Sequence, residues 1–223
     1  ACAPSSANHG RPEVMEKRCR LLFVLVGLAG MTIASADDDL PIPSEDLVYC
    51  TVCHGIQLMG NDAIKAPRLS GMEAWYVEQQ LENFKTGVRG LHEGDAIGID
   101  MQPMAAALSD DQIIAAAEFT NATHSPPPPV TVEGDIENGE RLYSTCAACH
   151  GVNGEGNEAL GAPSLTVAND WYLVTQLRKF KDGIRGAHPA DIYGMQMRAS
   201  AGLLADDEAI DDVVTYINTL QDQ

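Results

Sequence analysis

The chain has 223 residues, enough for one large domain or two small ones. Its formal net charge is −18 at pH 7, and so acidic a surface repels nucleic acid and anionic lipid, which argues against both as partners. The acidity suits a basic docking partner or a salty environment, although solubility alone is the alternative explanation.

The first 36 residues have the features of a processing signal rather than of a fold. A basic stretch that begins at Met15 precedes an apolar run over residues 21–33, and residues 34–36 read Ala-Ser-Ala, a small-residue cleavage pattern. The apolar run is shorter than the about 20 residues that span a bilayer, so an uncleaved membrane anchor is the less favoured alternative. We predict export by a signal peptide, a mature start at Asp37, and upstream sequence in residues 1–14.

Residues 50–54 and 146–150 share the pattern Cys-x-x-Cys-His, the attachment signature of c-type haem. Two thiols one helical turn apart can form thioether bonds with the two vinyl groups of one porphyrin, and the next histidine then lies under the ring as an iron ligand. A zinc or dithiol site is the alternative, and the histidine after each pair argues against it. The sequence therefore predicts two covalently bound haem c groups, held by Cys50, Cys53 and His54 and by Cys146, Cys149 and His150.

A tandem duplication organises the chain. Shifted by 96 residues, the sequence matches itself without a gap from residue 50 to about residue 114, which indicates two copies of one module rather than a solenoid. Four consecutive prolines between the copies favour an extended, semi-rigid strap, with an SH3-type ligand as the alternative. We predict a first domain over residues 37–120, a proline-rich linker over residues 121–133 and a second domain over residues 134–223.

Helical signals run through the first module. Residues 43–49 leave room for only a short helix before the cysteine motif, and Ser44 is its predicted N-cap. Residues 75–86 carry apolar side chains at helical spacing and end at Gly87, which favours an amphipathic helix with a glycine C-cap. Residues 109–112 read Ser-Asp-Asp-Gln, the spacing of a capping box at the start of another helix.

The second module repeats these helices. A longer first helix is expected from residue 134, ahead of the motif, and residues 171–182 form the twin of the amphipathic helix and end at Gly183. A final helix starts near Asp206. Convincing strands are absent from both modules, so the predicted fold class is all-α, with two tandem domains that each enclose one haem.

The second axial ligand decides between electron transfer and small-molecule chemistry, because an open position lets the iron bind oxygen or peroxide. The repeat register pairs Met101 with Met197, whereas Met104 and Met195 have no methionine at the equivalent place. We therefore predict that Met101 and Met197 are the ligands opposite the two histidines, and that Met104 and Met195 fill the core. His92 and His188 could compete as ligands, but their polar surroundings predict surface loops.

Three further pairs matched by the repeat have predicted supporting roles. A backbone carbonyl near a proline could accept the Nδ1–H of the haem histidine and fix its ring, with an ordinary loop proline as the alternative. An arginine could bind haem propionates through its forked donors, with a solvated charge as the alternative. A tryptophan could form part of the core or the haem wall. The residues are, in that order, Pro67 and Pro163, Arg89 and Arg185, and Trp75 and Trp171.

These residues resemble the cytochrome c4 family, di-haem proteins built from two class I cytochrome c domains. The resemblance covers the chain from about residue 44 onward and rests on the paired cysteine motifs, on Ala-Pro-x-Leu segments at Ala66 and Ala162, on two Gln-Leu-x-x-Phe-Lys helices and on residues 101–105. It implies a pseudo-twofold relation between the domains, propionate edges that face each other, and Met101 and Met197 as axial ligands.

The resemblance also implies a function. It points to a periplasmic or membrane-associated carrier that passes electrons from a quinol-oxidising complex to a terminal haem–copper oxidase. The electron-transfer subunit of a larger enzyme, such as a flavocytochrome c sulfide dehydrogenase, is the alternative, whereas a di-haem peroxidase would need one open iron. The two modules differ in the length of their first helix and in the loop around each methionine, so we expect two different potentials in an order that the sequence leaves open.

Overall fold

The structure, a computed structural model, describes residues 43–221. The predicted signal peptide lies outside the described residues. Every described residue belongs to one compact unit, residues 39–223. Its regular elements are helical, and the described range contains only two isolated β-bridges, Asn61 with Ala66 and Asn157 with Ala162. The predicted all-α class is therefore confirmed. Within residues 43–221 no helix is long and apolar enough to cross a membrane.

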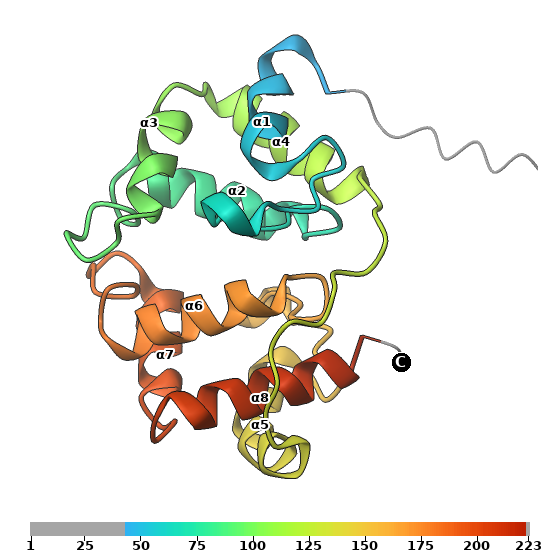
Figure 1. Ribbon diagram of the computed structural model, residues 1–223. Helices are drawn as coiled ribbons and strands as arrows, with labels where there is room; N and C mark the ends of the chain where they lie inside the picture. Colours follow the sequence, from blue (N-terminus) through green and yellow to red (C-terminus); the bar gives the residue numbers. More distant parts are fainter. Residues whose placement is uncertain (1–42, 222–223) are drawn as a thin grey trace, which may run out of the picture. The chain divides into compact units, whose positions relative to one another are not determined.

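The first module contains the helices α1 (Val48–His54), α2 (Ala74–Lys85), α3 (Met101–Ala106) and α4 (Asp110–Ala122), with short 3-10 turns between them (Figure 1). The predicted capping box is present, since Ser109 Oγ accepts from Gln112 N at 3.3 Å and Gln112 Oε1 accepts from Ser109 N at 2.9 Å. Ser44 is the N-cap residue of the first 3-10 turn, as predicted, and its backbone carbonyl accepts from the amides of Leu47 and Val48, but its side chain makes no cap hydrogen bond.

The second module contains α5 (Ile136–His150), α6 (Asp170–Lys181), α7 (Ile192–Ala201) and α8 (Asp207–Thr219). Asp135 caps α5 by accepting from the amides of Glu137 and Asn138 at 2.9 and 3.1 Å, and Asp206 caps α8. The first helix has 15 residues here and 7 in the first module, as the sequence predicted. In the second module α5 packs along α8, whereas the shorter α1 makes few contacts with α4 in the first module.

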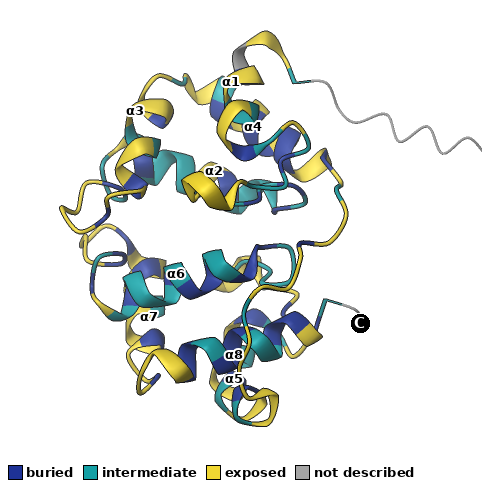
Figure 2. Ribbon diagram, in the orientation of Figure 1, coloured by how far each residue is buried: buried dark blue, intermediate teal, exposed yellow. Residues whose placement is uncertain are grey.

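The apolar core is largest in the second module (Figure 2). Ile210, Val213 and Val214 of α8 are almost fully buried at its centre. The same cluster takes in Met72 and Val77 from the first module, so buried apolar contacts continue from one module to the other. Burial of this kind, at roughly 1.5–3 kcal/mol for each large aliphatic side chain, holds the modules together as one unit.

The close approach of α5 to α8 depends on a glycine. A Cβ at Gly139 would lie far inside contact distance of the Asp212 carbonyl, and the tyrosine Cβ at residue 216 is also close. We expect Gly139→Ala to lower the free energy of unfolding by about 1–3 kcal/mol, because the helices must move apart. Thermal unfolding measures the loss. Gly202→Ala is the matched control, since its added Cβ would meet neighbours at 3.3–3.4 Å; an equal loss in both variants would contradict the packing argument.

The segment between the modules is anchored at both ends. Helix α4 continues through Ala122, so the extended part begins at Thr123, two residues later than predicted. At one end, the guanidinium of Arg68 donates to the carbonyls of Ser125 and Pro126 at 2.9 and 2.7 Å. At the other end, Asp170 accepts from strap amides that follow the prolines. We use the name strap for residues 123–135.

Candidate haem sites

The haem motif of the second module occupies the last turn of α5, which ends at His150. Nδ1 of His150 lies 2.7 Å from the carbonyl oxygen of Pro163, and Nε2 lies 3.5 Å from Sδ of Met197 on α7. A carbonyl can only accept, so Nδ1 carries the proton and the lone pair of Nε2 faces the thioether. A nitrogen from α5 and a sulfur from α7, the pair of ligands expected of an electron-transfer haem, therefore lie close together.

The first module has the same histidine geometry. His54 ends α1, and its Nδ1 lies 2.6 Å from the carbonyl oxygen of Pro67, 13 residues further on, as in the other module. Met101 is half-buried and is the first residue of α3. Among residues 43–221, a direct histidine–methionine contact is recorded for the second module only, so Met101 as a ligand stays a prediction from the repeat.

Both histidines are buried, at 5% and 4% exposure for His54 and His150. Burial lowers the pKa of each imidazole below its ordinary value, and the hydrogen bond to the proline carbonyl opposes this only in part. A neutral ring with its proton on Nδ1 leaves Nε2 free to bind iron, and bonding at Nδ1 fixes the ring orientation.

This burial predicts an acid-dependent loss of stability. The unfolded chain binds protons on both histidines below about pH 6.5, while the folded chain keeps them neutral, so the free energy of unfolding falls as the pH drops through that value. Iron on Nε2 acts in the same direction. Chemical denaturation at pH 7.5 and pH 5.5 measures it, and equal or greater stability at the lower pH would contradict the neutral state of the two buried rings. Buried carboxylates affect stability only at lower pH, because the pKa of Asp95, for example, lies below its ordinary value.

The two cysteines of each motif differ in exposure. Cys50 and Cys146 are half-buried, whereas Cys53 and Cys149 are exposed. Each pair is spaced by three residues on a helix, which places both sulfurs on one face. The paired thiols are therefore arranged to form two bonds to one flat group that lies beside the following histidine.

A cavity lies beside His150 and Met197. Most of its lining is apolar and comes from α6, α7, α8 and the segment between α5 and α6, and side chains of the first module also reach it; the lining includes Leu173, Leu177, Phe180, Val213, Ile217 and Tyr76. An apolar wall with a histidine and a thioether suits the porphyrin of a haem. The tyrosines that follow Trp75 and Trp171 line this cavity, while the half-buried tryptophans stack edge-on against them.

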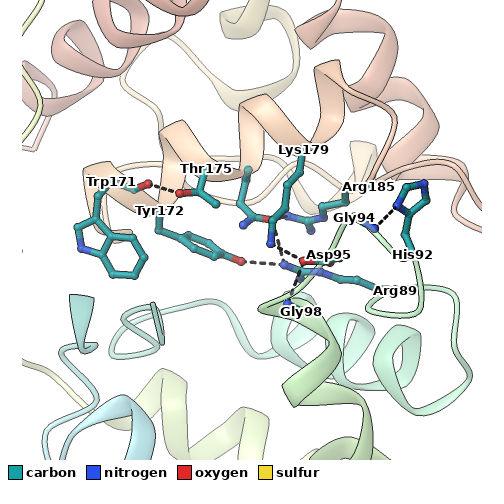
Figure 3. Close-up of polar contacts among 11 residues, drawn as sticks. Arg89, His92, Gly94, Asp95, Gly98, Trp171, Tyr172, Thr175, Lys179 and Arg185 are labelled. Atoms are coloured by element: carbon teal, nitrogen blue, oxygen red, sulfur yellow. Dashed lines mark hydrogen bonds and ion pairs between the residues drawn. The ribbon is translucent and has the colours of Figure 1, made fainter. Parts of the chain in front are cut away.

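The two arginines matched by the repeat form a reciprocal set of hydrogen bonds between the modules, of which Figure 3 shows the bond from Arg89 to Tyr172. Each guanidinium donates to a glutamine of its own module and to a tyrosine and a glutamine of the other. The contacts are Arg89 with Gln80 (2.8 Å), Tyr172 (3.0 Å) and Gln176 (3.0 Å), and Arg185 with Gln176 (2.9 Å), Tyr76 (3.0 Å) and Gln80 (2.9 Å). Exchange of the modules maps one set onto the other, which is the predicted pseudo-twofold relation.

These arginines provide a test of whether a haem fits. Their hydrogen-bond partners in this set are all neutral, Arg185 is buried, and Nε of Arg89 is buried without a partner among the described residues. Buried cations require compensating groups, and two haem propionates would supply anionic oxygens at this place. Arg89 and Arg185 therefore fit a haem whose propionates lie between the modules. The alternative of a solvated charge is wrong for Arg185, because this side chain is buried. Propionate binding by Arg89 and Arg185 stays a prediction.

Two remaining sequence predictions concern methionines and histidines outside the motifs. Met104 and Met195 do not fill the core: they are 46% and 41% exposed, because α3 buries only Ala105 and α7 only Gly194 and Ala201. His92 and His188 lie on exposed turns, as expected, where each Nδ1 accepts a nearby backbone amide.

Sequence reasoning missed the role of Tyr76, Gln80, Tyr172 and Gln176. All four match their partners in the repeat, so the signal was present, but equivalence alone does not say that residues of one copy contact the other. Asp95 and Lys179, which form a buried ion pair between the modules, were also missed. Lys179 has no lysine at the equivalent position, and no pattern within one module would reveal its partner.

Comparison with known proteins agrees with this geometry. A family model described as cytochrome c matches residues 47–123 and again residues 136–221. A cytochrome c4 of Azotobacter vinelandii is 30% identical over 222 residues, covering 92% of this chain and 100% of that protein. A protein of Stutzerimonas stutzeri described as a thiosulfate dehydrogenase electron acceptor is 34% identical over 170 residues, covering 71% of this chain and 73% of its own length.

A solved structure supports the same assignment. Reduced cytochrome c4 from Pseudomonas stutzeri matches with a TM-score of 0.60 at 27% identity, over 77% of this chain and 93% of that one. Both cysteine pairs fall within the two matched cytochrome c regions, so they hold two covalently bound haem c groups. The chain therefore belongs to the cytochrome c family, as a di-haem member of the cytochrome c4 family.

Proposed function

We propose that this protein is a mobile electron carrier with two histidine–methionine sites, which takes electrons from a quinol-oxidising complex and delivers them to a terminal haem–copper oxidase or another reductase. The observation that carries the proposal is the approach of His150 Nε2 and Met197 Sδ to 3.5 Å, with the imidazole held by Pro163. If both residues hold the iron of a haem, no ligand position would be left for a substrate.

When bound, each haem supplies reversible one-electron chemistry. The residues of the chain prepare it. The carbonyls of Pro67 and Pro163 hold the two imidazoles in one orientation, so little rearrangement accompanies a change of charge. The thioethers of Met101 and Met197 would fill the remaining ligand positions and would favour the reduced state. No bond is made or broken in the protein, and we propose no catalytic residue.

A redox titration followed by visible spectroscopy tests this proposal. Two low-spin haems that are each reduced and reoxidised reversibly, without peroxide turnover, are the expected result. A high-spin haem in the purified protein, or peroxide turnover, would instead indicate an open iron and an enzyme.

The second candidate function is electron acceptance from thiosulfate dehydrogenase, and the description of the Stutzerimonas stutzeri relative favours it. The two candidates differ in the donor. Reduction of the purified protein by thiosulfate dehydrogenase with thiosulfate, compared with reduction by a quinol-oxidising complex with quinol, distinguishes them. Rapid reduction in only one of the two mixtures identifies the donor class, and slow reduction in both would contradict a carrier for either.

A periplasmic location is part of the proposal. It is supported by the sequence pattern of the first 36 residues and by the chemistry of covalent haem attachment. The exposed acidic surface suits a basic docking face on a redox partner, and peripheral attachment to the membrane is the alternative to free diffusion. Fractionation of cells that produce the chain would show which holds.

A further inference from the structure

The carbonyl that holds the haem histidine of the second module belongs to a peptide group whose amide is bound by the first module. The oxygen of the peptide between Pro163 and Ser164 lies 2.7 Å from Nδ1 of His150. The N–H of the same peptide donates to Oε1 of Glu73 at 2.7 Å. One peptide group therefore links the histidine of one module to a carboxyl side chain of the other.

The same chain of hydrogen bonds exists in the opposite direction. The oxygen of the peptide between Pro67 and Arg68 lies 2.6 Å from Nδ1 of His54. Its N–H donates to Oδ1 of Asn169, a buried residue of the second module, at 2.7 Å. The repeat places Asn169 at the position equivalent to Glu73. The two contacts are therefore one arrangement, repeated across the pseudo-twofold.

Both acceptors occupy positions from which a side chain ordinarily caps its own helix. Glu73 is the N-cap residue of α2 and Asn169 is the N-cap residue of α6, yet neither side chain makes a cap hydrogen bond. Asparagine is among the residues that cap helices best. Each side chain instead extends to the other module, which indicates that the contact between the modules takes precedence over local capping.

The two amides are closely covered by backbone. A Cβ at Gly60 would lie 2.6 Å from the amide nitrogen of Arg68, and a Cβ at Gly156 would lie 2.6 Å from that of Ser164. Both glycines have a positive φ, of 88° and 84°, which other residues rarely adopt. The backbone is thus shaped to enclose the peptide groups that hold the haem histidines.

Glu73 has a feature that stability does not explain. Its second carboxyl oxygen, Oε2, is buried without a hydrogen-bond partner among residues 43–221. A buried oxygen that lacks a partner lowers stability. A glutamine could accept from the amide of Ser164 through its own oxygen, so the bond alone does not require a carboxyl group at this position.

We propose that Glu73 and Asn169 are positioning residues, each of which acts through one peptide group on the haem histidine of the opposite module. This inference rests on the proposed function, in which both histidines bind iron. An acceptor on the N–H of a peptide polarises the group, so its carbonyl accepts more strongly from Nδ1. A stronger bond at Nδ1 fixes the ring and makes Nε2 a better iron ligand. Each module thereby completes the histidine support of the other.

The test observes the Nδ1 proton of each haem histidine by NMR, in reduced holoprotein with isotope-labelled histidine. Glu73→Ala should make this proton of His150 exchange faster with solvent and leave that of His54 unchanged. Asn169→Ala should do the reverse. Glu73→Gln, which keeps an oxygen acceptor, should restore slow exchange in large part. Each substitution is therefore expected to act on the histidine of the other module.

The potentials provide a second measurement. A histidine that is held less firmly stabilises the oxidised iron less. At a fixed ambient potential, Glu73→Ala should therefore raise the ratio of reduced to oxidised second site, by about tenfold for an outer partner of a metal ligand. Asn169→Ala should raise the ratio for the first site in the same way. Because Asn169 is neutral, lost charge cannot explain that second result.

Glu78→Gln is the matched control, because it removes an exposed carboxylate from the same helix and should leave both ring protons unchanged. A purely structural role would give another pattern. If each alanine variant changed both histidines alike, or changed neither, the proposal would be overturned. Wild-type protein with two low-spin sites but no response to these substitutions would reject the inference alone. A high-spin site in the wild type would instead contradict the proposed function.

Discussion

Met197→Ala is expected to remove the low-spin, high-potential state from the second site and leave the first site unchanged. In the structure, Met197 Sδ is 3.5 Å from Nε2 of His150, so its loss takes away the thioether that faces this histidine. The iron would then be open to water or peroxide, and the potential of that haem would fall because a thioether favours the reduced state. A redox titration should show one reversible high-potential haem where the wild type shows two.

The neighbouring methionine is the matched control. Met195 lies two residues earlier on the same helix and is 41% exposed, so Met195→Ala should leave both haems low-spin. Met101→Ala should repeat the Met197 result in the first module, with Met104→Ala as its control. Loss of a methionine-ligated haem in the Met104 variant, with none in the Met101 variant, would show that the register argument chose the wrong residue.

Asp170→Ala is expected to give the largest loss of stability, about 3 kcal/mol or more, because each buried donor left without an acceptor costs about 1–3 kcal/mol. Asp170 is 1% exposed. It accepts from the strap amides of Thr131 and Val132 at 2.5 and 2.9 Å, and also from the amide of Trp171 and the side chain of Asn218. Alanine would leave these donors buried without an acceptor. Denaturant unfolding of the holoprotein measures the change.

A surface carboxylate of the second module provides the control. Asp207 forms an exposed ion pair with Arg178, so Asp207→Ala should cost less than about 1 kcal/mol. Donation from Thr131 and the backbone amides outweighs burial and holds the pKa of Asp170 below its ordinary value. Its contribution is therefore present above about pH 4 and is lost as the pH falls further. An Asp170 variant as stable as the Asp207 variant would show that the strap contributes little to folding.

The sequence alone was sufficient to predict the helices and the position of the histidine in each haem site. Capping and periodicity are local signals, so the capping box at Ser109 and the helix that ends before Gly87 were predicted closely. The hydrogen bond from each histidine to a proline carbonyl was predicted from equal spacing in the two copies. Both results depend on residues close together in the chain, where the local backbone decides the geometry.

The contacts between the modules could not be predicted in the same way. The repeat identifies Arg89 and Arg185 as equivalent, but it does not say that each one bonds to the tyrosine of the other copy. Such a contact depends on how the two copies pack across the pseudo-twofold. The exposure of Met104 was missed for a related reason, since a short helix of six residues gives too little periodicity to separate an inner face from an outer one.

The conformation of the strap could be predicted from its composition, but its anchoring contacts could not. Its four prolines predict an extended segment, and the structure adds what fixes it in place. The buried guanidinium of Arg68 donates to the carbonyls of Ser125 and of the first proline, Pro126, and Asp170 accepts from amides that follow the prolines. A module boundary that looks like a flexible linker in the sequence is therefore tied to both domains.

The proton NMR spectrum of the fully reduced protein tests the central claim most directly, namely that both haems have histidine and methionine ligands. A methionine methyl bound to iron lies over the face of the haem, where the ring current moves its signal far from those of all other methyl groups. Two such signals are predicted, one lost in Met101→Ala and the other in Met197→Ala. A spectrum with one signal or none, or with signals that survive both substitutions, would contradict the account.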